Sequence, residues 1–486
     1  MMDLSRSHAF RLSIRAILGI ILMGISILGC TPNEAWRKDP RCTSPGCDQS
    51  FFVDHGEYDF AFLEFTERGN LFDRSRQKEV VDYVAELAKT ENGAMVVVFA
   101  HGWKNNAEVT NGTVVDFRDL FHRAAKVIKP KQRMVGIYVA WRGLSVEAPG
   151  IQELTYWDRK TAAEQIGKGG VTELLLELEH AVNDAGDPNK NVYLVTGHSF
   201  GAGIVLSALN EILLERVVTA PQVKGCDRAT SLDCACVETR PFGHGVVLLN
   251  PAIEANEAFQ LKEAVAERCF GPNQVRLMHV ISSDADRATN KVFRVGQWLG
   301  MLKWKEAQLL NDGASRGHEY SLDTFTVGNY LPFQTGQLCG QLSEQDRRPV
   351  CRRRLNGRPS DCVRESGAWD YVSYAGRPEC VPMDDRLDHI PVRHNEPLAF
   401  IQTDDAFIGD HSDVFTNNVA GYLAAIVVEA ACKRASSASE SAERKPYPDG
   451  CVKPTQIIRD GCVEDDKFDF GVCFNTFRTE FVKEKG

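Results

Sequence analysis

The sequence lacks the patterns that identify most metal-dependent and nucleic-acid-binding proteins. It contains no C-x-x-C pair and no H-E-x-x-H motif, so we expect neither a zinc site nor any other metal or cofactor. Its net charge of −10 arises from acidic and basic residues mixed along the chain, whereas a nucleic-acid interface needs a basic face. We therefore expect no nucleic-acid partner.

The N-terminal apolar run, residues 16–28, is too short to cross a bilayer comfortably as a permanent helix. Three arginines precede it, as in a signal peptide. The run ends in Leu-Gly-Cys30, which resembles the lipobox of bacterial lipoproteins. The resemblance implies cleavage after residue 29 and acylation of Cys30, which would anchor the protein by lipid to a membrane of the bacterial envelope, facing the periplasm or the cell exterior. An uncleaved anchor helix and an ordinary cleaved signal are the alternatives.

The cysteine content agrees with an oxidising compartment. The chain has 15 cysteines, so acylation of one would leave an even number for disulfides. Zinc binding is the competing explanation, but the nearest pattern, Cys234-Ala-Cys236, has no second half at zinc-ligand spacing. Disulfides are therefore expected, with a connectivity that the sequence leaves open.

Apolar runs rich in Val and Ile alternate with helical patterns along most of the chain. The predicted strands are 58–66, 94–100, 133–140, 192–197, 244–250, 276–283 and 397–402, and the predicted helices are 75–90, 113–129, 158–185, 200–216 and 254–267. This alternation predicts an α/β fold with a mostly parallel, doubly wound sheet. Ligands bind such sheets at the carboxyl ends of the strands.

Two regions interrupt the alternation. The predicted organisation is a signal peptide (1–29), a tether (30–54), the first part of the core (55–302), a cysteine-rich insertion (303–395), the second part of the core (396–432), and a linker with a cysteine-containing tail (433–486). The insertion carries an arginine-rich stretch at 351–354. Those arginines either bind an anionic substrate or lie in a solvated, functionally neutral segment.

One pentapeptide carries the strongest chemical signal. The apolar run 192–197 leads into Gly197-His-Ser199-Phe-Gly201, and an apolar helical pattern follows. A nucleophilic serine needs this strand-to-helix turn, because small neighbours let its hydroxyl stand clear of the sheet. Ser199 is thus the predicted nucleophile, and a tight turn with an idle serine is the alternative.

Such a serine also needs an oxyanion hole and a base. The strand 94–100 ends in His101-Gly102-Trp103. Hydrolases whose serine lies in such a strand-to-helix turn place an oxyanion donor at this position. The backbone N–H groups of Trp103 and Phe200 are the predicted donors. We expect His101 to shape this loop and not to act as the base.

In hydrolases with this turn, the order along the chain is serine, acid, histidine. The base must therefore follow the acid, which leaves four histidines: His318, His389, His394 and His411. Only His411 lies in a turn between a late strand and a long apolar helix, so it is the predicted base. The acid is expected just past strand 276–283. Asp284 and Asp286 both fit that position, and location alone does not separate them.

At these residues the chain resembles the α/β-hydrolase superfamily, and more narrowly a group of bacterial esterase-like proteins with His-Gly-Trp at the oxyanion loop. The resemblance covers roughly 55–300 and 397–430, and it includes the Trp-Arg-Gly sequence at 141–143. It implies an α/β-hydrolase fold and assigns the acid to Asp286, which begins Asp-Arg-Ala-Thr. The chain departs from the pattern at Asp410, where a glycine before the histidine is more usual.

The expected function is that of a serine hydrolase with a Ser199–Asp286–His411 triad, acting on carboxylic esters or lipid acyl groups. A peptidase or amidase of the same fold is the first alternative. A non-catalytic envelope lipoprotein that uses a hydrolase scaffold for binding is the second.

Overall fold

A computed structural model of the chain describes most of residues 31–438. The described residues are 31–42, 47, 49–127, 132–146, 155–183, 190–223, 235–271, 273–301, 319–339, 370–373, 396–403, 405, 407–438, 463–464 and 467–468. The predicted signal peptide, Cys30 and the arginine-rich stretch 351–354 lie outside them. Within this described part, no helix combines the length and apolar character that a membrane span requires.

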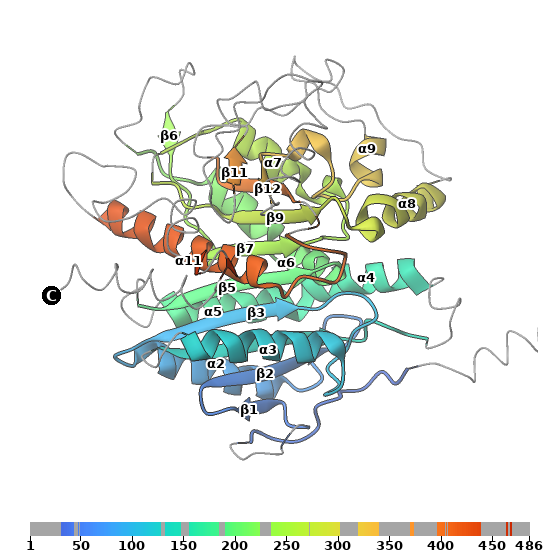
Figure 1. The fold of residues 1–486 in the computed structure, drawn as a ribbon, viewed down its shortest axis with the longest axis vertical. Helices are drawn as coiled ribbons and strands as arrows, with labels where there is room; N and C mark the ends of the chain where they lie inside the picture. The colour runs from blue at the N-terminus through green and yellow to red at the C-terminus, as the bar shows by residue number, and fades with distance from the viewer. Residues whose placement is uncertain are drawn as a thin grey trace, which may run out of the picture.

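A ten-stranded sheet forms the centre of the fold, in the order β1-β2-β4-β3-β5-β7-β9-β12-β10-β11 (Figure 1). From β2 to β10 every neighbouring pair is parallel, and only the two edge pairs are antiparallel. The strands are β1 (Phe52–Asp54), β2 (Tyr58–Phe65), β3 (Ala94–Ala100), β4 (Arg133–Trp141), β5 (Val192–His198), β7 (Gly245–Leu249), β9 (Met278–Ser283), β10 (Gly336–Cys339), β11 (Asp370–Ser373) and β12 (Leu398–Thr403).

Helices cover both faces of this sheet. They are α2 (Arg74–Lys89), α3 (Gly112–Val127), α4 (Tyr156–Ile166), α5 (Thr172–Asn183), α6 (Phe200–Val218), α7 (Phe259–Ala266), α8 (Phe293–Met301), α9 (Glu319–Thr324) and α11 (Asn417–Ala438). Short helical segments are η2 (Gly167–Val171), η3 (Ala255–Ala258), η4 (Ala288–Val292) and η5 (Leu331–Phe333). Minor strand pairs are β6 (Cys236–Val237) with β8 (Cys269–Phe270), and β13 (Val463–Glu464) with β14 (Lys467–Phe468).

Alternating side chains of β3 show how the two layers form. Val96 and Val98 belong to the core cluster shared with α2, α5 and α6, whereas Met95 and Phe99 pack in a second cluster with α3. A third cluster joins β7, β9 and β12 to α11. In Figure 1, α3 and α11 accordingly lie on the near side of the sheet, and α5 and α6 lie behind it. The predicted α/β class with a mostly parallel sheet is confirmed.

The structure differs from the predicted organisation in three places. Residues 336–339, expected to be irregular, form β10 and extend the sheet beside β12. Helix α11 continues through residues 433–438, where a linker was expected. Residues 31–42 pack on the core, because the carboxylate of Glu64 accepts the backbone N–H groups of Trp36 and Arg37.

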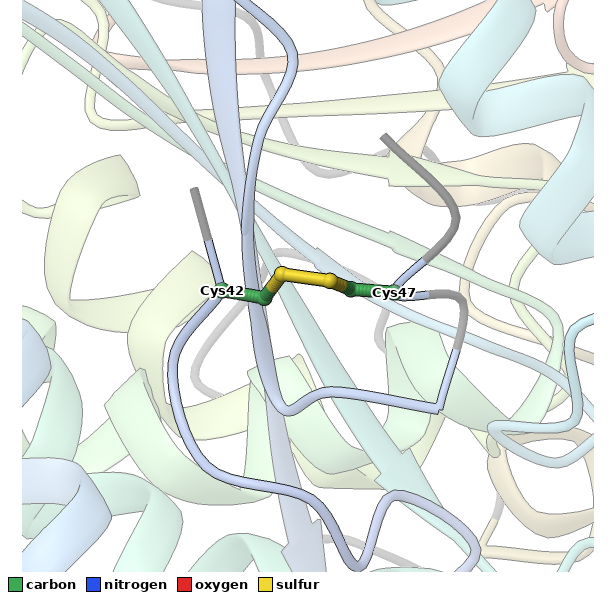
Figure 2. Close-up of a disulfide and its surroundings, with 2 residues drawn as sticks. All are labelled: Cys42 and Cys47. Carbon is green, nitrogen blue, oxygen red and sulfur yellow. A yellow bond between two sulfur atoms is a disulfide. The ribbon is translucent and has the colours of Figure 1, made fainter. Parts of the chain in front are cut away.

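The cysteines that the structure describes are consistent with disulfides. Cys42 and Cys47 are joined, closing a short loop beside β1 (Figure 2). Cys236 in β6 and Cys269 in β8 each take part in a disulfide. The cysteines of the tail lie outside the described residues.

Candidate active site

Ser199 occupies a strained turn between β5 and α6. Its φ of 56° and ψ of −121° lie outside the conformations that a serine readily adopts. Glycines on either side make the turn possible. A Cβ on Gly197 would lie 2.5 Å from the backbone oxygen of Gly201, and a Cβ on Gly201 would overlap the backbone oxygen of Ala100. The small residues of the pentapeptide are therefore required by backbone contact.

The structure brings the three predicted triad residues together. Nε2 of His411 lies 2.8 Å from Oγ of Ser199, and Nδ1 of His411 lies 2.8 Å from Oδ2 of Asp286. The Asp286 side chain is fully buried, while a quarter of the His411 side chain is exposed. An orienting acid, a base and a hydroxyl thus form one hydrogen-bonded series that opens toward solvent.

The other candidates for acid and base are not part of this series. Asp284 is exposed, and its backbone N–H donates to the carbonyl of Thr403. His318, His389 and His394 lie outside the described residues.

The carboxylate of Asp286 is held in its charged form. Burial alone would raise its pKa, but hydrogen bonds from His411 and Thr289 outweigh burial and lower the pKa below its ordinary value. Oδ1 accepts the backbone N–H groups of Ala288 and Thr289, and Oδ2 accepts the Thr289 hydroxyl as well as His411. An ionised, fixed carboxylate can orient the imidazole and stabilise its protonated form.

Two residues that the sequence did not single out hold the His411 loop. The backbone carbonyl of His411 accepts hydrogen bonds from Nε2 of His198, at 2.7 Å, and from Nδ2 of Asn250, at 3.2 Å. Asn250 also donates to the carbonyl of Asp410 and accepts the backbone N–H of Ser283. It therefore connects the ends of β7 and β9 to the loop that carries the base.

His198 is permanently neutral near physiological pH. Burial, followed by the neighbouring His411, lowers its pKa to about 3. Because a carbonyl only accepts, the Nε2 of His198 must carry the proton of the neutral ring. His198 is thus a fixed donor to the backbone of His411. Its place beside Ser199 in the pentapeptide is the only sequence feature that could have marked it.

The predicted oxyanion loop lies against the nucleophile. A Cβ on Gly102 would lie 2.8 Å from Cβ of Ser199, so the backbone passes directly beside the serine. In the part of the chain that the structure describes, the backbone N–H groups of Trp103 and Phe200 donate no hydrogen bond. Two free donors flanking a serine hydroxyl can receive a developing oxyanion.

His101 shapes this loop from inside the protein. Its Nε2 accepts the backbone N–H of Trp141, so the proton resides on Nδ1, which contacts the carbonyl of Gly102. The indole of Trp141 donates to the carbonyl of His101. Burial lowers the pKa of His101 to about 4. His101 is therefore a buried, neutral support and makes no contact with Ser199 of the kind that His411 makes.

Four aromatic side chains pack together beside the turn that carries the nucleophile, with Tyr156 in contact with the other three. The ring of Tyr156 lies 5.7 Å from that of Trp103, 5.3 Å from that of Phe200 and 6.4 Å from that of Phe293. Among the described residues, Nε1 of Trp103 and the hydroxyl of Tyr156 are buried without a hydrogen-bond partner. An unpaired buried donor costs about 1–3 kcal/mol, so these two atoms are suited to an acceptor on a bound molecule. We call these four residues the aromatic wall.

Among the described residues, no group of three or more His, Cys, Asp or Glu side chains could hold a metal ion. The chemistry that the triad supports is nucleophilic attack by Ser199 with His411 as the base, which needs only the groups already described.

No known family model matches the chain, and no curated protein is significantly similar to it in sequence. Two solved structures of the phospholipase PlaB from Legionella pneumophila, one in complex with thio-NAD, show distant similarity at 13% sequence identity. The TM-scores are 0.25 and 0.24, with 52% and 58% of this chain covered. In both cases the match covers 48% of the PlaB chain, so this chain spans about half of that protein's length.

Proposed function

We propose that the protein is a serine hydrolase that cleaves carboxylic esters, with acyl lipids as its natural substrates, and that it is anchored in the bacterial envelope through Cys30. The observation that carries the hydrolase proposal is the continuous hydrogen-bonded series from Asp286 through His411 to Ser199, on a strained turn. A serine that merely made a hydrogen bond at the protein surface would need neither the buried carboxylate of Asp286 nor the strained backbone of Ser199.

In the first half of the reaction, Oγ of Ser199 attacks the ester carbonyl carbon while Nε2 of His411 takes the hydroxyl proton. The carbonyl oxygen becomes an oxyanion, stabilised by the N–H groups of Trp103 and Phe200. When the intermediate collapses, the bond to the leaving oxygen breaks, and His411 returns the proton to the departing alcohol. An acyl group then remains on Ser199.

In the second half, water takes the place of the alcohol. His411 removes a proton from the water as it attacks the acyl-enzyme, and the same two N–H groups stabilise the second oxyanion. Collapse releases the carboxylic acid and returns the proton to Ser199. Asp286 holds the imidazole in one tautomer throughout and stays ionised.

Two features support an acyl-lipid substrate. The partly buried rings of the aromatic wall, Trp103 and Tyr156, provide apolar surface close to Ser199, as an acyl chain requires. The lipobox-like sequence at Cys30 would place the enzyme at a membrane, where such esters are abundant. Anchoring itself stays a prediction, and metabolic labelling with a clickable fatty acid, compared with Cys30→Ser, tests it.

A fluorophosphonate probe tests the proposed nucleophile. We expect the probe to label the wild-type protein and the Ser412→Ala control, but not Ser199→Ala, because the hydroxyl of Ser199 lies within hydrogen-bonding distance of a ring nitrogen of His411. Hydrolysis of p-nitrophenyl butyrate should fall by several orders of magnitude in Ser199→Ala. Unchanged hydrolysis in that variant would refute the proposal. Cleavage of amide but not ester substrates would favour the amidase alternative.

A further inference from the structure

The residue that follows the predicted acylation site is fixed at the catalytic edge of the sheet. Thr31 is buried, and its backbone N–H donates to the carbonyl of Ser145 at 3.0 Å. Its hydroxyl donates to the carbonyl of Leu144, and its own carbonyl accepts Nη1 of Arg142 at 2.7 Å. These three residues directly follow β4, at the carboxyl end where the triad lies. The predicted acylation site is the next residue toward the N-terminus, so an acyl anchor on it would attach the protein at this edge.

A short series of contacts connects this attachment point to the nucleophile. Gly143 accepts the backbone N–H of Lys104 and donates to the carbonyl of Asn105, which joins it to the oxyanion loop. Gly102 of that loop lies against Ser199. In Figure 1 the dark blue N-terminal segment accordingly ends on the side to which the arrows of β3, β7 and β9 point.

The same edge carries an exposed face that combines cationic and apolar side chains. Five side chains in the segment that follows Asp286, which includes η4 and the start of α8, are exposed: Arg287, Lys291, Val292, Arg294 and Val295. Val292 is 61% and Val295 59% exposed, and Trp157, which follows the Tyr156 that contacts Phe293, is 39% exposed. No acidic residue occurs from 287 to 301 in a chain of net charge −10. We call these six residues the η4–α8 face.

The opposite side of this segment is fixed to the catalytic site. Thr289 donates its hydroxyl to Asp286, and the buried Phe293 contacts the ring of Tyr156 in the aromatic wall. The segment that carries the exposed side chains is therefore anchored to residues of the catalytic site. Arg287 and Lys291 form no ion pair with any of the described residues. Arg294 is exposed, and its guanidinium lies over the ring of Phe325.

We propose that the η4–α8 face docks on an anionic phospholipid bilayer and presents the catalytic edge to the membrane that carries the anchor. This inference rests on the proposed function and adds the orientation of the enzyme and the source of its substrate. Exposed apolar side chains gain by entering the interface, and cations beside them gain from anionic headgroups. An anchor one residue before Thr31 would hold the catalytic edge close to the membrane, so the proposed substrate is an acyl lipid of the same bilayer.

Vesicle sedimentation tests docking without relying on catalysis or on the anchor. The parent protein is the chain from residue 30 with Cys30→Ser and Ser199→Ala, since every described residue follows residue 30. We expect it to sediment with vesicles of phosphatidylglycerol and phosphatidylcholine, and at least tenfold more weakly with phosphatidylcholine alone or in 0.5 M salt. The docking variant Lys291→Glu with Val292→Ser and Val295→Ser should bind the anionic vesicles at least tenfold more weakly than the parent.

The matched control changes the opposite edge of the sheet. Lys89→Glu with Val218→Ser alters one exposed cation and one exposed valine at the ends of α2 and α6, and it should bind as the parent does. Equal binding by parent and docking variant, or no binding by the parent, would overturn the proposal. Equal binding to both vesicle types would overturn the anionic partner.

Two substrates separate this proposal from the proposed function. With Ser199 restored in both proteins, the docking variant should hydrolyse soluble p-nitrophenyl butyrate as fast as the chain without the docking substitutions, but vesicle phosphatidylglycerol at least tenfold more slowly. Equal loss on both substrates would mean that the face supports the site and not the membrane. If Ser199 proves inert to fluorophosphonate, the proposed function fails, while the sedimentation result still decides docking.

Discussion

Nδ1 of His411 lies 2.8 Å from Oδ2 of Asp286, although the two residues are 125 positions apart in the chain. The strands before them explain the contact. Strands β9 and β12 are parallel neighbours, with Ser283 opposite Thr403, so the segments that follow both strands emerge at the same edge. Asp286 lies in the turn after β9, and the loop with His411 follows β12.

We expect Asp286→Asn to lower kcat/KM for ester hydrolysis on the order of a thousandfold or more, because the amide no longer fixes the tautomer of His411. Asp284→Asn is the matched control and should change the rate by less than about tenfold, since Asp284 is exposed. Steady-state kinetics with p-nitrophenyl butyrate measure both. Reversed effects would identify Asp284 as the acid, and two small effects would exclude both.

Gly102→Ala should impair catalysis more than stability. The new methyl group would lie 2.8 Å from Cβ of Ser199, so the oxyanion loop or the serine must shift. We expect a loss of about a hundredfold in kcat, which is the effect of losing one oxyanion donor. Gly112→Ala, with no atom within 4 Å of the new Cβ, is the control. Equal kcat values for the two variants would argue against an oxyanion role for this loop.

Two buried histidines that stay neutral should each make a destabilising contribution in mild acid. Their folded-state pKa values, about 4 for His101 and about 3 for His198, lie below the ordinary value of 6.5. Below pH 6.5 the unfolded chain therefore binds more protons than the folded chain, and unfolding is favoured until the folded pKa values are reached. From pH 7.5 to 5.5 each histidine should lower the free energy of unfolding by about 1 kcal/mol.

Urea denaturation at both pH values measures this contribution. The difference between the two unfolding free energies should shrink by about 1 kcal/mol in His198→Asn. It should stay at the wild-type value in His122→Gln, which replaces an exposed histidine. An unchanged difference in His198→Asn would contradict a neutral, buried His198.

The mature protein should contain almost no free thiols. Acylation of Cys30 would leave an even number of cysteines, and Cys42, Cys47, Cys236 and Cys269 are disulfide-bonded. Titration of the denatured, unreduced protein with a thiol reagent measures the number, and the reduced protein provides the control. Several reactive thiols before reduction would instead favour metal binding or a reducing compartment.

The sequence predicted the main elements closely because buried parallel strands are nearly continuous apolar runs. The predicted strand 192–197 corresponds to β5, and the predicted helix 75–90 to α2. The pentapeptide located Ser199 because backbone contacts of Gly197 and Gly201 leave little room for other residues there. Local chemistry and local pattern were sufficient for these features.

Features that depend on distant contacts were harder to predict. Asn250 follows β7 without a motif, and its role appears only where its amide meets carbonyls 160 residues later in the chain. Strand β10 has four residues, too few for a periodic pattern. Position along the chain did not separate Asp284 from Asp286, and the choice of Asp286 rested on the resemblance. The fold shows that Asp286 is buried against His411 and that Asp284 is exposed.

Asn250 fixes the backbone of the His411 loop, and this limits which parts of the protein can diverge. The backbone of His411 is held at the ends of β5 and β7 by His198 and Asn250, and its loop leaves the sheet where β12 pairs with β9. The stretch between β10 and β12 can therefore change in length or sequence without moving the imidazole, provided that both strands keep their places in the sheet. Specificity and regulation can be acquired there while the chemistry is inherited unchanged.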